Sequence, residues 1–365
     1  MNMLRAIEAR REKILKAYPH VSKQVAAIRK NSVNNLAKLL SQTREALKGK
    51  GCHVYLADRG EDAQQTIKNL LSGQEKVVRT YSNALREISF DALLGEAGIR
   101  VFKSHMGEII AEITAGQSAS ATGRHPFLPH IDLSREVVTQ ALQKFLNTEG
   151  NSAAEELNKA AHRKIKKNIL QCEFGVTGSN GIAAENGTLI IAEDEGNCRA
   201  VSNLPYRHLA VVGIEKIAYS VEDSLKTLEC QCIYGLGKAG PTYYSLISGP
   251  SRTGDIEFRI TFGMHGPKEV HVVLLDNGRL NLVDQGFGDV LKCIDCGACF
   301  ETIAPIAETS GWVGVSLTPK GIALGIVQGK LPKPKEELTI PAFTCPVGID
   351  GVQLGKILPQ IRSLT

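Results

Sequence analysis

Two short apolar runs decide the fold: His208-Leu-Ala-Val-Val212 and Val270-His-Val-Val-Leu-Leu275. Two further runs, Thr188–Ala192 and Phe258–Phe262, share their β-branched and apolar character. All four are too short for ordinary helices and are mostly bounded by Gly, Pro, Asn or charged residues, as strands usually are. The central part of the chain is therefore predicted to contain a set of short strands.

Helical segments alternate with strands on the N-terminal side of these runs. Strands are predicted at residues 52–56 and 99–102, where short apolar runs follow turn residues. This alternation is typical of an α/β fold, so we predict an α/β protein with a largely parallel sheet, with or without an antiparallel edge. Helical periodicity occurs at residues 4–50, 62–71, 107–113, 134–146 and 152–165.

The composition of the chain changes near residue 285. Beyond this point cysteines cluster and prolines recur, and a last helix is predicted at Gly351–Ile361. Three regions are predicted: an N-terminal helical region (residues 1–50), an α/β domain (residues 51–285) and a cysteine-containing C-terminal region (residues 286–365).

The bulk composition argues against two classes of partner. The net charge of the 365 residues is only +5 and aromatic residues make up 5%, which disfavours nucleic acid. The basic run at residues 159–167 has apolar positions around it at helical spacing, which indicates a solvated or partner-docking helix face. The start of the chain is unlike a secretory leader and no stretch of about 20 apolar residues occurs, so a cytoplasmic protein without a membrane span is predicted.

The motif Cys293-Ile-Asp-Cys296-Gly-Ala-Cys299 has the spacing of iron–sulfur ligands. Its two-residue spacers let three thiolates converge from one loop. Bacterial ferredoxins have a fourth cysteine four positions later, followed by proline, but this chain has Ile303 there. The last cysteine of such a run binds the other cluster in two-cluster ferredoxins, so Cys345, which precedes a proline, is the predicted fourth ligand of one [4Fe–4S] cluster.

Two alternatives remain for these four thiols: a Cys₄ zinc site and an inert group of cysteines. Zinc sites usually combine two CxxC pairs, whereas a CxxCxxC triple with a distant Cys-Pro is more typical of iron–sulfur proteins. The other cysteines have no ligand spacing and are predicted to be buried free thiols: Cys52, Cys172, Cys198, Cys230 and Cys232.

Polar loops near the predicted strands contain candidate ligand-binding residues. The loop Gly175–Gly181 offers backbone N–H groups and short polar side chains, which can hold a carboxylate or a phosphate. It matches neither the dinucleotide-binding nor the P-loop fingerprint. The anion-binding candidates in this loop and later ones are Thr177, Gly178, Ser179, Asn180, Asn197, Arg199, Ser251 and Arg252.

Four of the loop residues have side chains suited to particular roles. Arg199 and Arg252 are candidates for holding a carboxylate, because a guanidinium group can form paired hydrogen bonds to it. His265, which lies in a glycine-rich loop, or Glu195 is the candidate proton acceptor of a catalytic step. Several polar loops in one α/β domain predict a shared pocket for a small carboxylate or phosphate ligand.

Five motifs carry a family resemblance. They are Gly175-Val-Thr-Gly178, Glu185-Asn-Gly187-Thr, Glu195-Gly-Asn197-Cys-Arg199, Ile247-Ser-Gly-Pro-Ser251-Arg-Thr-Gly-Asp255-Ile-Glu257 and His265-Gly-Pro267. These motifs resemble the LUD domain of lactate-utilisation proteins, in particular the iron–sulfur subunits. The resemblance implies a fold similar to the NagB/RpiA/CoA-transferase group, with a helical N-terminus and a small ferredoxin-like iron–sulfur tail.

The same resemblance implies a function. It points to an iron–sulfur electron-transfer subunit of a multi-subunit oxidoreductase that oxidises L-lactate, a 2-hydroxy acid, to pyruvate. The implied partners are a redox subunit with cysteine-rich domains and a second LUD protein. The family tail normally has two complete cysteine runs, and this chain departs from that pattern. The alternative is a non-redox NagB/RpiA-like enzyme or a small-anion-binding protein whose cluster is structural or sensing.

Overall fold

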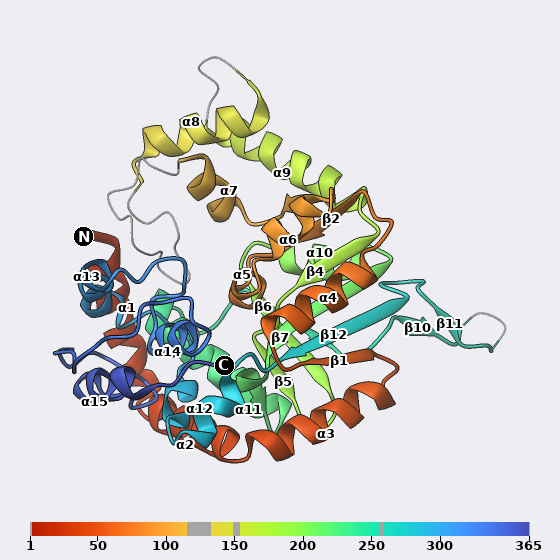
Figure 1. The fold of residues 1–365 in the computed structure, drawn as a ribbon. Helices are drawn as coiled ribbons and strands as arrows, with labels where there is room; N and C mark the ends of the chain where they lie inside the picture. The colour runs from red at the N-terminus through yellow and green to blue at the C-terminus, as the bar shows by residue number, and fades with distance from the viewer. Residues whose placement is uncertain (1, 115–132, 149–153, 256–257, 365) are drawn as a thin grey trace.

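A six-stranded sheet forms the centre of the molecule, and every neighbouring pair of its strands is parallel (Figure 1). The structure is a computed structural model that describes residues 2–114, 133–148, 154–255 and 258–364. The α/β prediction is confirmed. In spatial order the strands are β1 (His53–Ala57), β12 (Glu269–Leu275), β7 (Arg207–Gly213), β4 (Phe174–Thr177), β2 (Lys76–Arg79) and β3 (Arg100–Lys103).

Both faces of this sheet are buried, as is usual for a parallel sheet. Alternate side chains along a strand point to opposite faces. Leu209 and Val211 on β7 therefore join one hydrophobic cluster, and Ala210 and Val212 join another. The helices that cover the first face are α4 (Gly60–Leu70), α5 (Asn83–Glu87) and α6 (Phe90–Glu96).

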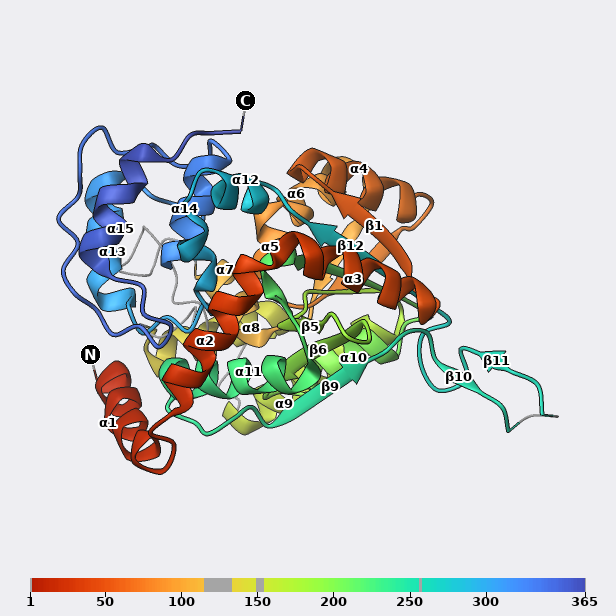
Figure 2. The same ribbon diagram turned by 90° about the horizontal axis from the view of Figure 1, so that it is seen from below.

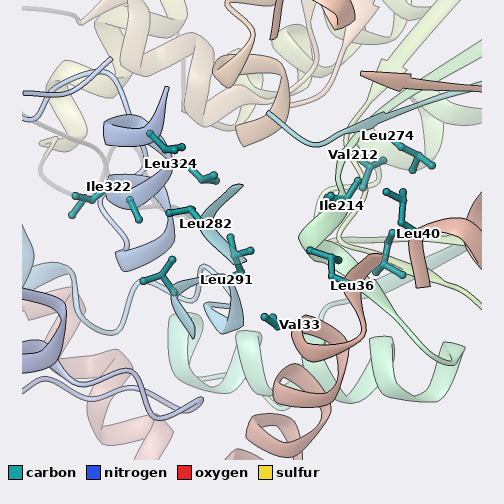
Figure 3. Close-up of a cluster of buried hydrophobic side chains, with 14 of the residues drawn as sticks. Val33, Leu36, Leu40, Val212, Ile214, Leu274, Leu282, Leu291, Ile322 and Leu324 are labelled. Atoms are coloured by element: carbon teal, nitrogen blue, oxygen red, sulfur yellow. The ribbon is translucent and has the colours of Figure 1, made fainter. Parts of the chain in front are cut away.

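The second face is covered by segments from both ends of the chain. Figure 3 shows Leu36 and Leu40 from the N-terminal helices near Val212 of the sheet. Ile322 and Leu324 from the C-terminal region belong to the same cluster. The residues on either side of position 285 thus share one hydrophobic core. The helices involved are α2 (Val21–Asn34), α3 (Leu36–Gly49), α13 (Phe300–Ser310), α14 (Pro319–Val327) and α15 (Gly351–Ile357).

A second, smaller sheet packs beside the first and contains the antiparallel pairs. Its central strands β5 and β6 are antiparallel to each other, and β9 is antiparallel to β6. Strand β8 pairs with β5 in parallel. In spatial order the strands are β8 (Ile217–Ala218), β5 (Gly181–Ala183), β6 (Thr188–Glu193) and β9 (Tyr243–Ile247).

The remaining helices surround these layers. Helix α1 (Asn2–Ala17) lies beside the C-terminal region in both views (Figures 1 and 2). Within the described ranges, no helix is both long enough and apolar enough to cross a membrane. The other helices are α7 (Met106–Ile113), α8 (Arg135–Leu146), α9 (Ala154–Leu170), α10 (Asn197–Asn203), α11 (Val221–Leu236) and α12 (Arg279–Asp284).

Most of the predicted elements are confirmed, but the strand at Phe258–Phe262 is wrong. Only Thr261–Phe262 forms a strand, β11, and it pairs with β10 (Arg252–Thr253) in a hairpin that projects away from both sheets (Figure 2). Phe258 has a φ of 55° and an exposed side chain. The apolar composition of this segment predicts a strand of a sheet, but the segment lies outside both sheets.

Two predicted helices differ in their limits. The helix predicted at residues 152–165 is α9, whose start falls next to residues 149–153, which lie outside the described ranges. The last helix ends at Ile357 and continues as a 3₁₀ turn, Leu358–Gln360, because Pro359 cannot donate a backbone hydrogen bond to an α-helix.

The C-terminal region depends on a close backbone crossing at Gly355. The Leu338 N–H donates to the Gly355 carbonyl (3.2 Å), and a Cβ at Gly355 would lie 1.9 Å from the Leu338 carbonyl oxygen. We expect Gly355→Ala to lower the free energy of unfolding by about 1–3 kcal/mol, because α15 must shift. Urea denaturation measures this loss. The matched control is Gly95→Ala on α6, where a Cβ meets nothing within 4 Å; an equal loss there would contradict the explanation.

Candidate metal centre and adjoining pocket

The four predicted cysteine ligands converge on one buried site. Cys293, Cys296 and Cys299 lie in the loop between a 3₁₀ turn (Gly288–Lys292) and α13, and Cys345 approaches from the segment before α15. All four line the same small cavity. The cavity therefore joins two segments that are more than forty residues apart in the sequence.

Backbone geometry turns the first three thiols toward this cavity. Asp295 (φ 55°) and Gly297 (φ 76°) both adopt the left-handed conformation, which aspartate and glycine tolerate better than most residues. The Asp295 N–H donates to Cys293 Sγ (3.4 Å) and the Ile349 N–H donates to Cys345 Sγ (3.3 Å). Hydrogen bonds to ligand sulfurs are among the features that set the potential of iron–sulfur centres.

The donor atoms that this cavity offers are sulfurs. Its described lining contains four cysteines and neither a histidine nor a carboxylate. Four thiolates are the usual ligand set of a [4Fe–4S] cluster, and zinc can use the same set. The residues present therefore fit a [4Fe–4S] cluster, which Cys293, Cys296, Cys299 and Cys345 would hold.

Burial disfavours the deprotonated form of these cysteines when no metal is bound. It raises the pKa of Cys293 to about 12, with a smaller contribution from the carboxylate of Asp295. Burial likewise raises the pKa of Cys296 and Cys299 well above the usual value. A thiolate ligand needs positive charge nearby, and a bound metal supplies it.

A chain of buried charges connects the cysteine loop to the sheet. Lys320 Nζ lies 2.7 Å from Asp295 Oδ2 and 3.0 Å from Glu215 Oε1. Glu215 lies just beyond the end of β7. Glu215 also pairs with Arg279, which lies 2.8 Å from Glu87. Burial alone would raise the pKa of Glu215, but Arg279 and Lys320 hold it well below its usual value. The chain of ion pairs anchors the cysteine loop to the carboxyl edge of the sheet.

A pocket of about 440 Å³ opens at this edge, beyond the ends of β2, β3, β4 and β7. Ligands of open α/β sheets usually bind at the carboxyl ends of the strands. We call this cavity the main pocket. Asp295 lines it, so the loop that holds three of the cysteines also forms part of the pocket wall.

Five of the predicted site residues line the main pocket: Gly178, Ser179, Asn180, Glu195 and Asn197. Several of their polar groups already bind the protein itself. The Ser179 hydroxyl bonds to the Gly181 and Ile190 carbonyls, and Asn180 Oδ1 accepts from the Ala192 N–H. A Cβ at Gly178 would lie 2.4 Å from Ser82 Oγ, so this glycine permits close packing. The residues of this loop therefore stabilise the fold as well as line the pocket.

The other predicted pocket residues lie elsewhere, so the prediction of one pocket shared by all the loops is wrong. Thr177 is buried, with its hydroxyl 2.8 Å from His208 Nε2. The exposed Arg199 packs over the Tyr243 ring (4.5 Å). Residues on or beside the projecting β10–β11 hairpin are Ser251, Arg252 and the exposed His265. The hairpin carries these side chains away from the sheet edge.

Two pocket residues were missed from the sequence. His105 Nδ1 accepts from the Glu108 N–H (3.1 Å), which leaves the proton of a neutral ring on Nε2, and Nε2 lies 3.7 Å from Glu195 Oε1. Lys216 donates to the Ser179 carbonyl (3.1 Å) and is the only lysine or arginine among the described lining residues. Both residues shortly follow parallel strands, a position that would have marked them.

The remaining cysteines are free thiols. Four of the five are buried as predicted, whereas Cys198 is half-buried and lines the main pocket. Burial and the carboxylates of Glu193 and Glu195 raise the pKa of Cys198, so its thiol is a weak nucleophile.

Comparison with known proteins identifies similar chains. An uncharacterized electron transport protein, YkgF, of Escherichia coli K12 is 32% identical over 317 residues, which are 85% of this chain and 64% of that protein. Lactate utilization protein B of Shouchella clausii KSM-K16 is 30% identical over 286 residues, 78% of this chain and 58% of the relative. The crystal structure of a DUF162 family protein from Deinococcus radiodurans has a TM-score of 0.36 and 14% identity, covering 66% of this chain and 98% of that one.

A family model also matches most of the chain. The chain spans about three fifths of the length of these two curated relatives. The family model of the LUD domain matches residues 40–275, which include both sheets and the main pocket's strands. The chain belongs to the LUD domain family.

Proposed function

We propose that this chain is an iron–sulfur electron-transfer component of a multi-subunit system that oxidises a 2-hydroxy acid such as L-lactate. The observation that carries the proposal is the position of Asp295, which lies between two cysteine ligands and also lines the main pocket. A [4Fe–4S] centre on the four cysteines would carry one electron at a time. The names of the relatives, an electron transport protein and lactate utilization proteins, support the same function.

The main pocket offers groups for a hydroxy acid. Lys216 would bind the carboxylate, because it is half-buried and pairs with no carboxylate in the described part of the chain. Glu195 would accept the hydroxyl proton, and His105 would hold the Glu195 carboxylate in place. These assignments replace Arg199, Arg252 and His265. The partners we propose are a subunit with cysteine-rich domains and a second LUD protein, which would carry the electrons onward.

Anaerobic purification tests the proposal. We expect about four iron and four sulfide per chain, a brown absorbance, and a paramagnetic signal after reduction with dithionite. Zinc in place of iron would contradict the metal assignment. A centre with full iron that no reductant changes would contradict electron transfer and leave a structural role.

A further inference from the structure

A second cavity, of about 140 Å³, adjoins the main pocket between α5 and α14. We call it the side chamber. Asn83, Lys216 and Asp295 line both cavities, so the two meet at these residues. The side chamber lies where the cysteine-containing region packs on the carboxyl edge of the sheet.

Three cationic side chains line the side chamber without a carboxylate partner. Within the described ranges, Arg86, Lys216 and Lys330 form no ion pair to a carboxylate within 4.0 Å; every ion pair of this cavity involves Arg279 or Lys320. Arg86 bonds to the Tyr81 hydroxyl (3.0 Å), and Lys216 and Lys330 each bond to a backbone carbonyl. Each cation keeps unused donors, since lysine has three and arginine five.

The carboxylates of the side chamber do not balance these charges. Glu87 and Glu215 bind Arg279, and Glu215 and Asp295 bind Lys320. These three carboxylates and two cations therefore form ion pairs only with one another among the residues that line the chamber. The three further cations leave the chamber with excess positive charge, which favours a multiply charged anion.

Two buried polar atoms in the side chamber lack partners. Asn83 Oδ1 and Ser316 Oγ are inaccessible to solvent and form no hydrogen bond in the described structure. A buried polar atom without a hydrogen-bond partner destabilises the folded chain. Both residues line the side chamber, so a ligand that carries hydroxyl groups as well as an oxyanion would reach the cations directly and these two oxygens after a rotation of their side chains.

Electron counting narrows the class of ligand. A hydroxy acid loses two electrons on oxidation, whereas the centre on the cysteines takes one at a time. The main pocket, at about 440 Å³, falls in the range of about 300–1,000 Å³ that suits drug-sized ligands. A three-carbon acid would leave most of it empty, so space remains for a carrier beside the substrate.

We propose that the two chambers together bind a phosphate-bearing carrier of the flavin mononucleotide class. Its phosphate would lie in the side chamber between Arg86 and Lys330, its ring system would lie in the main pocket, and Lys216, where the two cavities meet, would remain for the substrate carboxylate. A flavin accepts two electrons together and releases them singly, which a nicotinamide does not. The proposal rests on the proposed function.

The step balances with this carrier. The hydroxy acid's C–H bond breaks and transfers a hydride to the oxidised ring, the O–H proton passes to Glu195, and the C–O bond becomes C=O. The reduced ring then returns to its oxidised form by releasing one proton and two electrons, which pass one after the other to the cysteine-bound centre. The substrate loses two electrons and two protons in total. Because the cysteine-bound centre holds one electron at a time, it must pass each electron on to the redox partner subunit, which is the net oxidant.

Binding of two flavins to the full chain with its metal centre tests the proposal. We expect the fluorescence of flavin mononucleotide to be quenched on binding, with an affinity at least tenfold higher than that of riboflavin, which lacks the phosphate. Lys330→Ala and Arg86→Ala should each weaken flavin mononucleotide binding about tenfold and leave riboflavin binding unchanged. The matched control is Lys333→Ala, an exposed lysine of the same region that lines neither chamber.

Three outcomes would overturn the proposal: equal affinities for the two flavins, variants that weaken both flavins alike, or binding of inorganic phosphate with neither flavin bound. Iron content and reduction by dithionite are measured on the same samples. If these are normal and the flavin does not bind, only the carrier is excluded. If they are absent, the proposed function fails independently.

Discussion

Cys345→Ala is expected to remove the metal centre and to loosen the end of the chain at the same time. The variant leaves three thiols in one loop and no ligand from the segment before α15. We expect iron to fall from about four to below one per chain in anaerobic preparations. Because metal binding contributes directly to folding free energy where it joins two segments, we also expect α15 to lose protection from hydrogen exchange.

The matched control for this variant is Cys172→Ala. Cys172 is also buried, but it packs near α9 and bonds to the Asn168 carbonyl (3.2 Å), away from the cysteine loop. It should keep its iron and the protection of α15. Full iron in Cys345→Ala would show that another group completes the centre, and loss of iron without any change in α15 would show that the ligand does not hold this segment.

Glu215→Gln is expected to cause the largest loss of stability among charge substitutions. Glu215 is only 2% exposed and pairs with both Arg279 and Lys320. Without its charge, two buried cations share one fewer carboxylate, and breaking a buried pair in this way typically costs about 3–5 kcal/mol. Urea denaturation at neutral pH, followed by circular dichroism, measures the loss.

The same residue predicts a dependence on pH. Its pKa is lowered in the folded chain, so the unfolded chain binds the Glu215 proton more tightly. The stability that this carboxylate contributes is present above its unfolded pKa of about 4.3 and is lost as the pH falls through the lower folded value. Glu215→Gln should remove this part of the acid sensitivity, so wild type and variant should converge in stability at low pH.

An exposed ion pair provides the control. Glu222 pairs with Lys226 (2.7 Å) on the surface of α11, and Glu222→Gln should change stability little because solvent screens such pairs. A similar loss in both variants would mean that burial does not determine the effect. Equal stability of Glu215→Gln and wild type at neutral pH would show that the buried chain of charges is not needed to dock the cysteine loop.

The sequence predicts the centre of this fold and the convergence of the four cysteines well, for physical reasons. Strands β7 and β12 are buried on both faces, so each contains a run of consecutive apolar residues and the signal is strong. The ligand spacing of residues 293–299 is local, because one loop must supply three thiolates. Strands such as β2, four residues long and flanked by charges, carry little signal.

The pocket is predicted poorly because its residues come from separate strand ends. His105 and Lys216 have ordinary local sequences, and only the order of the strands brings them together. The local sequence suggests His265 as a proton acceptor because of its glycine-rich surroundings, and Arg252 as a carboxylate-binding residue because of its guanidinium group. Those glycines and polar residues belong to a hairpin, and nothing in the local pattern shows whether a hairpin folds onto the sheet or projects from it.

The continuous core across position 285 has a consequence for how such proteins can be divided. Leu282, Leu291 and Leu324 pack in the same cluster as Val212 of the sheet (Figure 3). Cutting the chain between the sheet and the cysteine loop would expose a broad apolar surface on both pieces, which favours aggregation. The cysteine-containing segment is therefore not an interchangeable module. Grafting it onto another protein would also require the face of the sheet on which it rests.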